Sequence, residues 1–329
     1  MPTSCQLDRS FFRNSGKDGV EIARFDRALE DYVATGSVSS WQKLNTDYPQ
    51  ETQTLVEDVL HLGAMDQEET EDSLRSFYAD STLVKVRHDI GAKFSDLSDY
   101  QDGLQQAFKK LESECSDFVT PHVYAQNSAF NQSIVVGDSL IGISLDKYLG
   151  ASYPAYAKYF SENQRATLEP SRIVQDCLSF YLAQLYILPS VRGNVRPTLL
   201  DWMMHQGKIA WVVARLTESD LVDIAGCQSE TKAWYKKNEA AVWAALNRPE
   251  VLESRDSALI SSIIMSGDAH PYFRDAHSRG VGLWTGMRIV DSYMKNHPEV
   301  TLDTLLHNTD YRTMLREAGY EPKACKKGC

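Results

Sequence analysis

Apolar side chains recur at helical spacing through most of this chain. Phe25, Leu29 and Tyr32 follow such a period early on, and Gly36 ends the run. From Pro170 onward the pattern is almost wholly helical. The helices predicted there cover residues 173–185, 198–213, 229–246, 283–296, 303–306 and 311–317.

Short segments in the first half of the chain have a residue pattern typical of β-strands. Their apolar and polar residues alternate, or they are rich in β-branched residues, and they are flanked by Pro, Asn or Gly. The segments lie at 83–86, 118–125, 133–136 and 140–145. We therefore predict an α+β fold dominated by helices, in which one small mixed sheet packs on a helical lobe.

Length sets the domain organisation that we expect. With 329 residues the chain is near the limit for a single hydrophobic core. Residues 1–19 are predicted to be a flexible N-terminal segment and residues 323–329 a tail. The domain between them, 20–322, divides into a sheet-containing part at about 20–150 and a helical lobe at about 151–322.

Net charge argues against a nucleic acid partner, and hydropathy argues against a membrane-spanning helix. Forty-five acidic against 34 basic residues give a net charge of −11, and a field of that sign repels phosphate backbones. Arg192 and Arg196 form the one internal basic cluster, and it makes no stripe. We predict no nucleic acid partner. Because no run of about 18 apolar residues occurs, no membrane-spanning helix is predicted either.

Familiar catalytic motifs are missing from the sequence. No two of the eight histidines stand four residues apart, so there is no H-E-x-x-H zinc motif. The chain also has no G-x-S-x-G nucleophile elbow and no G-x-x-x-x-G-K-[ST] phosphate loop. We predict no cofactor and a binding or scaffolding role rather than an enzyme.

The cysteines lack the spacing of a metal site or a disulfide scaffold. None forms a C-x-x-C pair, and Cys177 lies on the apolar side of a predicted helix, as expected for a buried thiol. Cys5 follows small residues and resembles the end of a bacterial lipoprotein signal whose apolar part has been removed; a free thiol is the alternative. Cys325 and Cys329 fit either a small disulfide or a frayed tail.

Several segments, taken in order, resemble a known family. They are 145–150 (LDKYLG), 153–156 (YPAY), 199–208 (LLDWMMHQGK), 234–239 (WYKKNE), 282–286 (GLWTG) and 318–322 (AGYEP). This order is similar to that of the gliding-motility lipoprotein B (GldB-like) family of Bacteroidota, over about residues 25–322. The resemblance implies an outer-membrane lipoprotein that faces the periplasm, with Cys5 as the lipidated residue and cell-envelope proteins as partners.

The same family is similar to zinc peptidases, and the resemblance therefore implies a zincin-like fold. In the best register Gln175 and Ser179 stand where the two zinc-binding histidines would be, Asp176 where the catalytic glutamate would be, and Gln206 where the third ligand would be. Two amides and a hydroxyl supply no imidazole or anionic donor for zinc. We therefore expect a degenerate site without a metal.

Three functions remain open at this stage. A non-catalytic scaffold would use a cleft for strand addition, with Asp176, Gln206 and Lys208 as polar groups on its floor. A hydrolase would rebuild its metal site from His205, Asp176 and a loop carboxylate. A glycan or peptide module would use the tryptophans. The further candidate cleft residues are Asn238, Glu239, Trp243 and Trp284.

Overall fold

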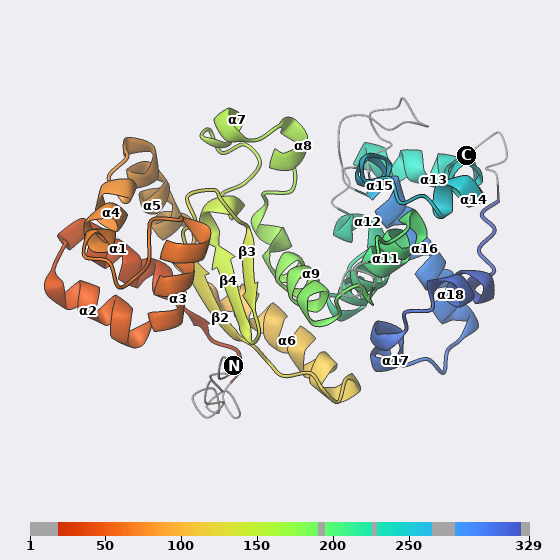
Figure 1. Cartoon of the computed structure of the whole chain (residues 1–329), viewed down its shortest axis with the longest axis horizontal. Coiled ribbons are helices and arrows are strands. Elements are labelled where there is room, and N and C mark those ends of the chain that lie inside the picture. The colour runs from red at the N-terminus through yellow and green to blue at the C-terminus, as the bar shows by residue number, and fades with distance from the viewer. Residues whose placement is uncertain (1–18, 190–194, 226–228, 265–279, 324–329) are drawn as a thin grey trace. The chain divides into compact units, whose positions relative to one another are not determined.

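Helices dominate the structure, and one four-stranded sheet accompanies them (Figure 1). This computed structural model describes residues 19–189, 195–225, 229–264 and 280–323. The chain forms two compact units, one of residues 1–109 and 118–177, the other of residues 110–117 and 178–329. The predicted helix-dominated α+β class is confirmed.

The first unit holds the sheet and the N-terminal helices. Its helices before the sheet are α1 (Phe25–Thr35), α2 (Val38–Asp47), α3 (Pro49–Gln53), a π-helix (Thr54–Val59), α4 (Glu69–Tyr78), α5 (Ser81–Lys93) and most of α6 (Ser98–Glu114). After the sheet come α7 (Tyr156–Tyr159), α8 (Glu162–Arg165) and the first turn of α9 (Ile173–Leu185). In Figure 1, α1 to α5 gather on one side of the strands.

The sheet has the strand order β1-β2-β4-β3, with bounds Ile22–Ala23, His122–Gln126, Leu140–Ser144 and Ile134–Gly137 in that order. β1 and β4 each run parallel to β2, whereas β3 pairs antiparallel with β4 and forms an edge. Three of the predicted strands are therefore confirmed to within a few residues.

The prediction of a strand at 83–86 is wrong, because these residues lie in α5. Asp80 caps that helix, since its Oδ1 accepts from the backbone N–H groups of Thr82 and Leu83. Leu83, Val86 and Ile90 are buried at spacings of three and four, while Val84 is 45% exposed. A helical period was thus present, and the short β-branched run hid it.

The residues at 145–156 form a buried hydrogen-bonded network. Asp146 is 0% exposed, and its carboxylate accepts from the backbone N–H groups of Ser128 at 2.8 Å and Phe130 at 2.5 Å. The Tyr156 hydroxyl donates to the Asp146 carbonyl and accepts from the Leu149 N–H. These side chains tie the loop after β2 to the segment after β4, so their role in the structure is architectural.

The second unit is helical in its described part. It contains the remainder of α9 together with α11 (Leu199–Leu216), α12 (Leu221–Ile224), α13 (Ser229–Leu246), α14 (Pro249–Leu252), α15 (Ser257–Ile264), α16 (Val281–Asn296), α17 (Leu302–His307) and α18 (Tyr311–Ala318). Each predicted helix from residue 170 onward is present. Thr198 and Asp201 form a reciprocal capping box that starts α11.

Helices α11 and α16 cross at two glycines and pack closely. A Cβ atom at Gly207 would lie 2.3 Å from the backbone carbon of Gly286, and one at Gly286 would lie 2.0 Å from the carbonyl oxygen of Met203. The two backbones can approach this closely because neither residue has a side chain. This crossing fixes α11, the helix that carries Gln206.

Candidate functional site

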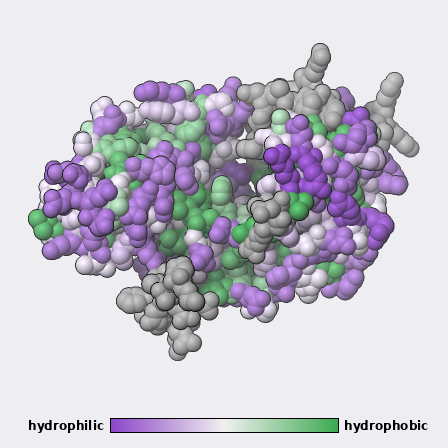
Figure 2. Space-filling view, viewed as in Figure 1, coloured by the Kyte–Doolittle hydropathy of each residue, from purple (hydrophilic) through white to green (hydrophobic). Residues whose placement is uncertain are grey.

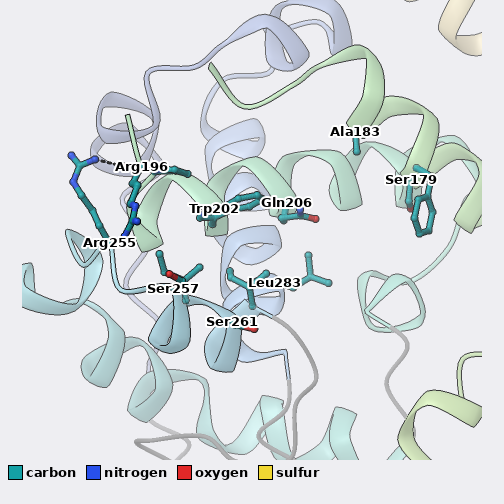
Figure 3. A pocket seen from close by; sticks show the side chains of 13 residues that line it. Ser179, Ala183, Arg196, Trp202, Gln206, Arg255, Ser257, Ser261 and Leu283 are labelled. Atoms are coloured by element: carbon teal, nitrogen blue, oxygen red, sulfur yellow. Dashed lines mark hydrogen bonds between the residues drawn. The ribbon is translucent and has the colours of Figure 1, made fainter. Parts of the chain in front are cut away.

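A pocket of about 760 Å³ opens among the helices of the second unit. Its volume is within the usual range for ligand sites. The lining comes from α9, from the segment before α11, from α11, from Arg255 ahead of α15, from α15 itself and from α16. It consists of Ser179, Phe180, Ala183, Arg196, Pro197, Trp202, Gln206, Arg255, Ser257, Ile260, Ser261, Ile264 and Leu283. Figure 3 shows the arrangement.

Helical periodicity explains which side chains reach the pocket. On α11 Trp202 and Gln206 stand four residues apart, and Ser179 and Ala183 do the same on α9. On α15 the contributing positions are 257, 260, 261 and 264, which form one face of that helix. In Figure 3 the α11 side chains lie across from Ser257 and Ser261 of α15.

Two arginines lie together at one end of the pocket, and Ser179 and Ala183 lie at the other (Figure 3). The Arg255 guanidinium donates from Nη1 to the backbone carbonyl of Arg196. A backbone bond from the Leu199 N–H to the Ser254 carbonyl, 2.9 Å long, joins the same two segments. The Arg255 guanidinium is therefore held beside the backbone of Arg196.

The four positions of the degenerate zinc motif do not all belong to this pocket. Ser179 and Gln206 line it. Gln175 and Asp176 belong to the first unit, where both are half-buried on α9. The pocket thus carries a hydroxyl and an amide from the predicted set.

Asp176 is engaged by two neighbours through both of its carboxylate oxygens. The Tyr148 hydroxyl donates to Oδ2 at 2.9 Å, and Nη2 of Arg172 donates to Oδ1 at 3.0 Å. Burial raises the pKa of Asp176, and the charge of Arg172 opposes that rise. The side chain is therefore held as a structural partner of the loop that contains Tyr148.

His205 and Lys208 lie on a buried face of α11. Nδ1 of His205 lies 3.0 Å from the Tyr311 hydroxyl, and burial, aided by the nearby Lys208 charge, lowers the pKa of His205 to about 4. Lys208 is 1% exposed, and its Nζ donates to the carbonyls of Leu306 at 2.7 Å and Asn308 at 3.0 Å. The lysine therefore binds the C-terminal end of α17.

Lys208 gives a prediction for the pH dependence of stability. Burial lowers its pKa to about 8. The unfolded chain then binds more protons between pH 8 and about 10.5, so the Lys208 contribution to the free energy of unfolding rises with pH over that window. Relative to Lys208→Met, wild-type protein should gain roughly 1.5 kcal/mol between pH 8 and 9.5. Urea unfolding at both values measures it; an equal pH response of the two proteins would contradict the assigned pKa.

The other candidate cleft residues lie in a cluster around α13 and α16. Oε1 of Glu239 accepts from Nε of Arg288 and from the Tyr320 hydroxyl, both at 2.7 Å. Trp243 packs edge-on against Tyr320, with ring centroids 5.3 Å apart. Glu239 also lines a smaller pocket of about 310 Å³. This arrangement ties the C-terminal segment to α13.

Trp284 and Asn238 have contacts of a similar kind. The Trp284 ring stacks on Tyr235 at 5.0 Å and is buried. Nδ2 of Asn238 donates to the Trp234 carbonyl, one helical turn earlier. Neither residue lines the 760 Å³ pocket.

The cysteines divide between described and undescribed residues. Cys177 is fully buried, as predicted, and burial raises the pKa of its thiol well above the ordinary value. Cys5, Cys325 and Cys329 lie outside the described residues.

The described ranges contain neither a metal-binding cluster nor a membrane-spanning helix. Within residues 19–189, 195–225, 229–264 and 280–323, no three His, Cys, Asp or Glu side chains group closely enough to hold a metal ion. In the same ranges no helix has the length and apolarity needed to cross a bilayer. Hydrophilic residues predominate on the face shown in Figure 2.

A family model, that of the gliding motility protein GldB, matches residues 13–322. The chain belongs to the GldB family. This membership associates it with gliding motility and with the lipoproteins of the cell envelope. No curated protein and no solved structure matches the chain.

Sequence reasoning overlooked most of the pocket. Arg196 was noted only as half of a small basic cluster, and Arg255 lies 59 residues further on. Phe180, which is 48% exposed, lies within the helix predicted at 173–185, and its apolar ring gives no sign of that exposure. The one available signal was the helical face of α15, and that face does not reveal which helices lie opposite.

Proposed function

We propose that the chain is a non-catalytic lipoprotein, anchored through Cys5, that faces the periplasm and binds a partner protein of the cell envelope. The binding site is the 760 Å³ pocket of the second unit. The scaffold is zincin-like, with the zinc ligands replaced. The GldB family membership supports the envelope setting, and the mixed sheet with its antiparallel edge strand β3 is compatible with the scaffold.

The chemistry of the pocket lining carries the proposal. Its polar members are hydroxyls, one amide, one indole and two guanidinium groups, and no carboxylate, imidazole or thiol is among the described residues that line it. A general acid–base pair or a zinc ion needs such groups. An apolar wall with a few placed donors suits recognition.

Phe180 supports a protein partner rather than a purely internal cavity. Its ring lines the pocket while 48% of the residue is exposed. Large aromatic side chains left open at a pocket rim are typical of interaction sites.

Metal analysis tests the non-catalytic part of the proposal. Protein purified without chelators should contain only trace zinc, and its thermal unfolding should not respond to added zinc or to EDTA. Near-stoichiometric zinc that is lost in both His205→Ala and Asp176→Ala would overturn it in favour of a hydrolase with a rebuilt site.

Photo-crosslinking tests the partner. A benzoylphenylalanine introduced in place of Phe180 should crosslink one discrete envelope protein in intact cells. The matched control is the same substitution at Val84, an exposed residue of the first unit. If the two positions give the same adducts, or if position 180 gives none, the pocket is not the binding site.

A further inference from the structure

Within the described residues, the two arginines at the end of the pocket have no acidic partner. Among the described residues neither Arg196 nor Arg255 forms an ion pair, although the whole chain carries a net charge of −11. Both side chains are exposed, and the hydrogen bond from the Arg255 guanidinium to the Arg196 backbone carbonyl ties the two residues together. Two like charges at one end of a pocket repel each other, and an anion that contacts both removes that repulsion.

The acids closest in sequence are already used by the helices. Asp201 accepts from the Thr198 N–H at 2.8 Å and helps to cap α11. Asp256 accepts from the N–H groups of Ala258 at 2.8 Å and Leu259 at 2.9 Å and caps α15. Because the first N–H groups of both helices are satisfied in this way, an anion at this end would be held by the guanidinium groups.

The walls beyond the arginines are apolar but carry separated hydrogen-bonding groups. Trp202, Ile260 and Leu283 supply apolar surface. The side chains of Ser179, Gln206 and Ser257 have no hydrogen-bond partner among the described residues. An alkyl chain would leave these groups unsatisfied on binding, whereas the amides of a peptide can pair with them.

We propose that this pocket binds the carboxyl-terminal segment of its partner protein, with the terminal carboxylate on Arg196 and Arg255 and apolar last side chains against Trp202, Ile260 and Leu283. The inference rests on the proposed partner-binding function and names the part of the partner that is recognised. A volume of about 760 Å³ accommodates a few residues of extended chain rather than a folded domain. Capture of a chain terminus by fixed donors is an established mode of peptide recognition.

Fluorescence anisotropy with a labelled hexapeptide, Gly-Ser-Gly-Leu-Ala-Leu, tests the carboxylate. The free acid should bind the full chain, and its C-terminal amide should bind about tenfold more weakly or worse, since a charge-assisted hydrogen bond contributes about 1.5–3 kcal/mol. Added salt should weaken binding of the acid more than binding of the amide. Equal affinity of acid and amide would refute carboxylate recognition.

Variants locate the binding. Arg196→Gln combined with Arg255→Gln should weaken the acid about tenfold or more and leave the amide unchanged. Arg316→Gln is the matched control, because Arg316 is exposed on α18 and does not line the pocket. Unfolding curves should be alike for all three proteins. An unchanged affinity in the double variant, or no binding of the acid to wild-type protein, overturns the proposal.

Two further measurements separate this inference from the function on which it rests. Dodecanoate that binds in an arginine-dependent way, while the peptide does not bind, would replace the peptide by a lipid-like carboxylate and overturn the inference. Mass spectrometry of the adduct formed from position 180 should identify the last residues of the partner. An adduct with an internal segment of an envelope protein would leave the proposed function standing and refute the carboxyl-terminal reading.

Discussion

Gly286→Ala should destabilise the second unit by about 3 kcal/mol or more, although the same change at an open helical position is stabilising. The new Cβ would lie 2.0 Å from the carbonyl oxygen of Met203 and 3.3 Å from the Cα of Gly207. Both contacts are with backbone, so no side-chain rotation relieves them, and α11 and α16 must separate. Denaturant unfolding followed by tryptophan fluorescence measures the loss, because Trp202, Trp211 and Trp284 lie on these helices.

Gly91→Ala is the matched control for this prediction. Gly91 lies in α5, and a Cβ there meets no atom within 4 Å. This variant should be as stable as wild-type protein or gain up to about 1 kcal/mol. If Gly286→Ala behaved like Gly91→Ala, the close crossing of α11 and α16 would be incorrect.

Asp146→Ala should lower the free energy of unfolding of the first unit by about 3 kcal/mol at pH 7, because two buried backbone N–H groups lose their hydrogen-bond acceptor. The donors are those of Ser128 and Phe130. The loop they belong to includes Ala129 and Phe130, with φ values of 51° and 69°, a conformation that non-glycine residues adopt at a cost. The carboxylate stabilises this loop conformation, so without it the backbone is expected to leave the conformation. Chemical denaturation monitored by circular dichroism measures the change.

The pH response distinguishes Asp146 from a generic core residue. Burial raises the pKa of Asp146 to about 6, above its unfolded value near 4. The folded protein then holds an extra proton between about pH 4 and 6, and the resulting contribution is lost as pH rises through 6. The stability difference between wild-type protein and Asp146→Ala should therefore be about 2 kcal/mol larger at pH 4 than at pH 7.

Asp138→Ala controls for loss of a carboxylate in the same unit. Asp138 is exposed in the turn between β3 and β4. Its removal should change the free energy of unfolding by less than about 0.5 kcal/mol at either pH. A pH-independent difference for Asp146→Ala, or a loss as small as that of the control, would contradict the buried network.

Six helices of the second unit could be predicted because their signals are local, whereas α12, α14 and α15 were missed. Thr198 with Asp201, and Thr301 before α17, are caps within four residues of the helix they start. The strands β2, β3 and β4 were likewise bounded by turn residues. The strand prediction at 83–86 was wrong because a segment of four residues fits the period of a strand as well as that of a helix. Only the longer spacing to Ile90 reveals the helix.

The pocket could not be predicted in the same way. Its lining comes from segments between residues 179 and 283, and it forms only when four helices pack. Two of the four residues in the expected zinc-peptidase register, Ser179 and Gln206, line this pocket, and Gln175 and Asp176 do not. The sequence does not predict that Arg255 lies near Arg196, because the backbone hydrogen bond that joins their segments forms only in the folded structure. The aromatic residues near Glu239 looked like a binding surface, yet they pack on the C-terminal segment.

Strand β1 determines where mechanical load on the N-terminal segment enters the fold. It has two residues, and it pairs with β2 at Val123 and Tyr124. The side chain of Gln101 accepts from the Ile22 N–H at 3.0 Å, and Gln105 does so from Val20. Within the described residues, tension applied at residue 19 therefore reaches β1 and these two amides of α6 first. Because β1 has only two residues, of which Ile22 is the buried one, its detachment would open one edge of the sheet and uncover little of the hydrophobic core.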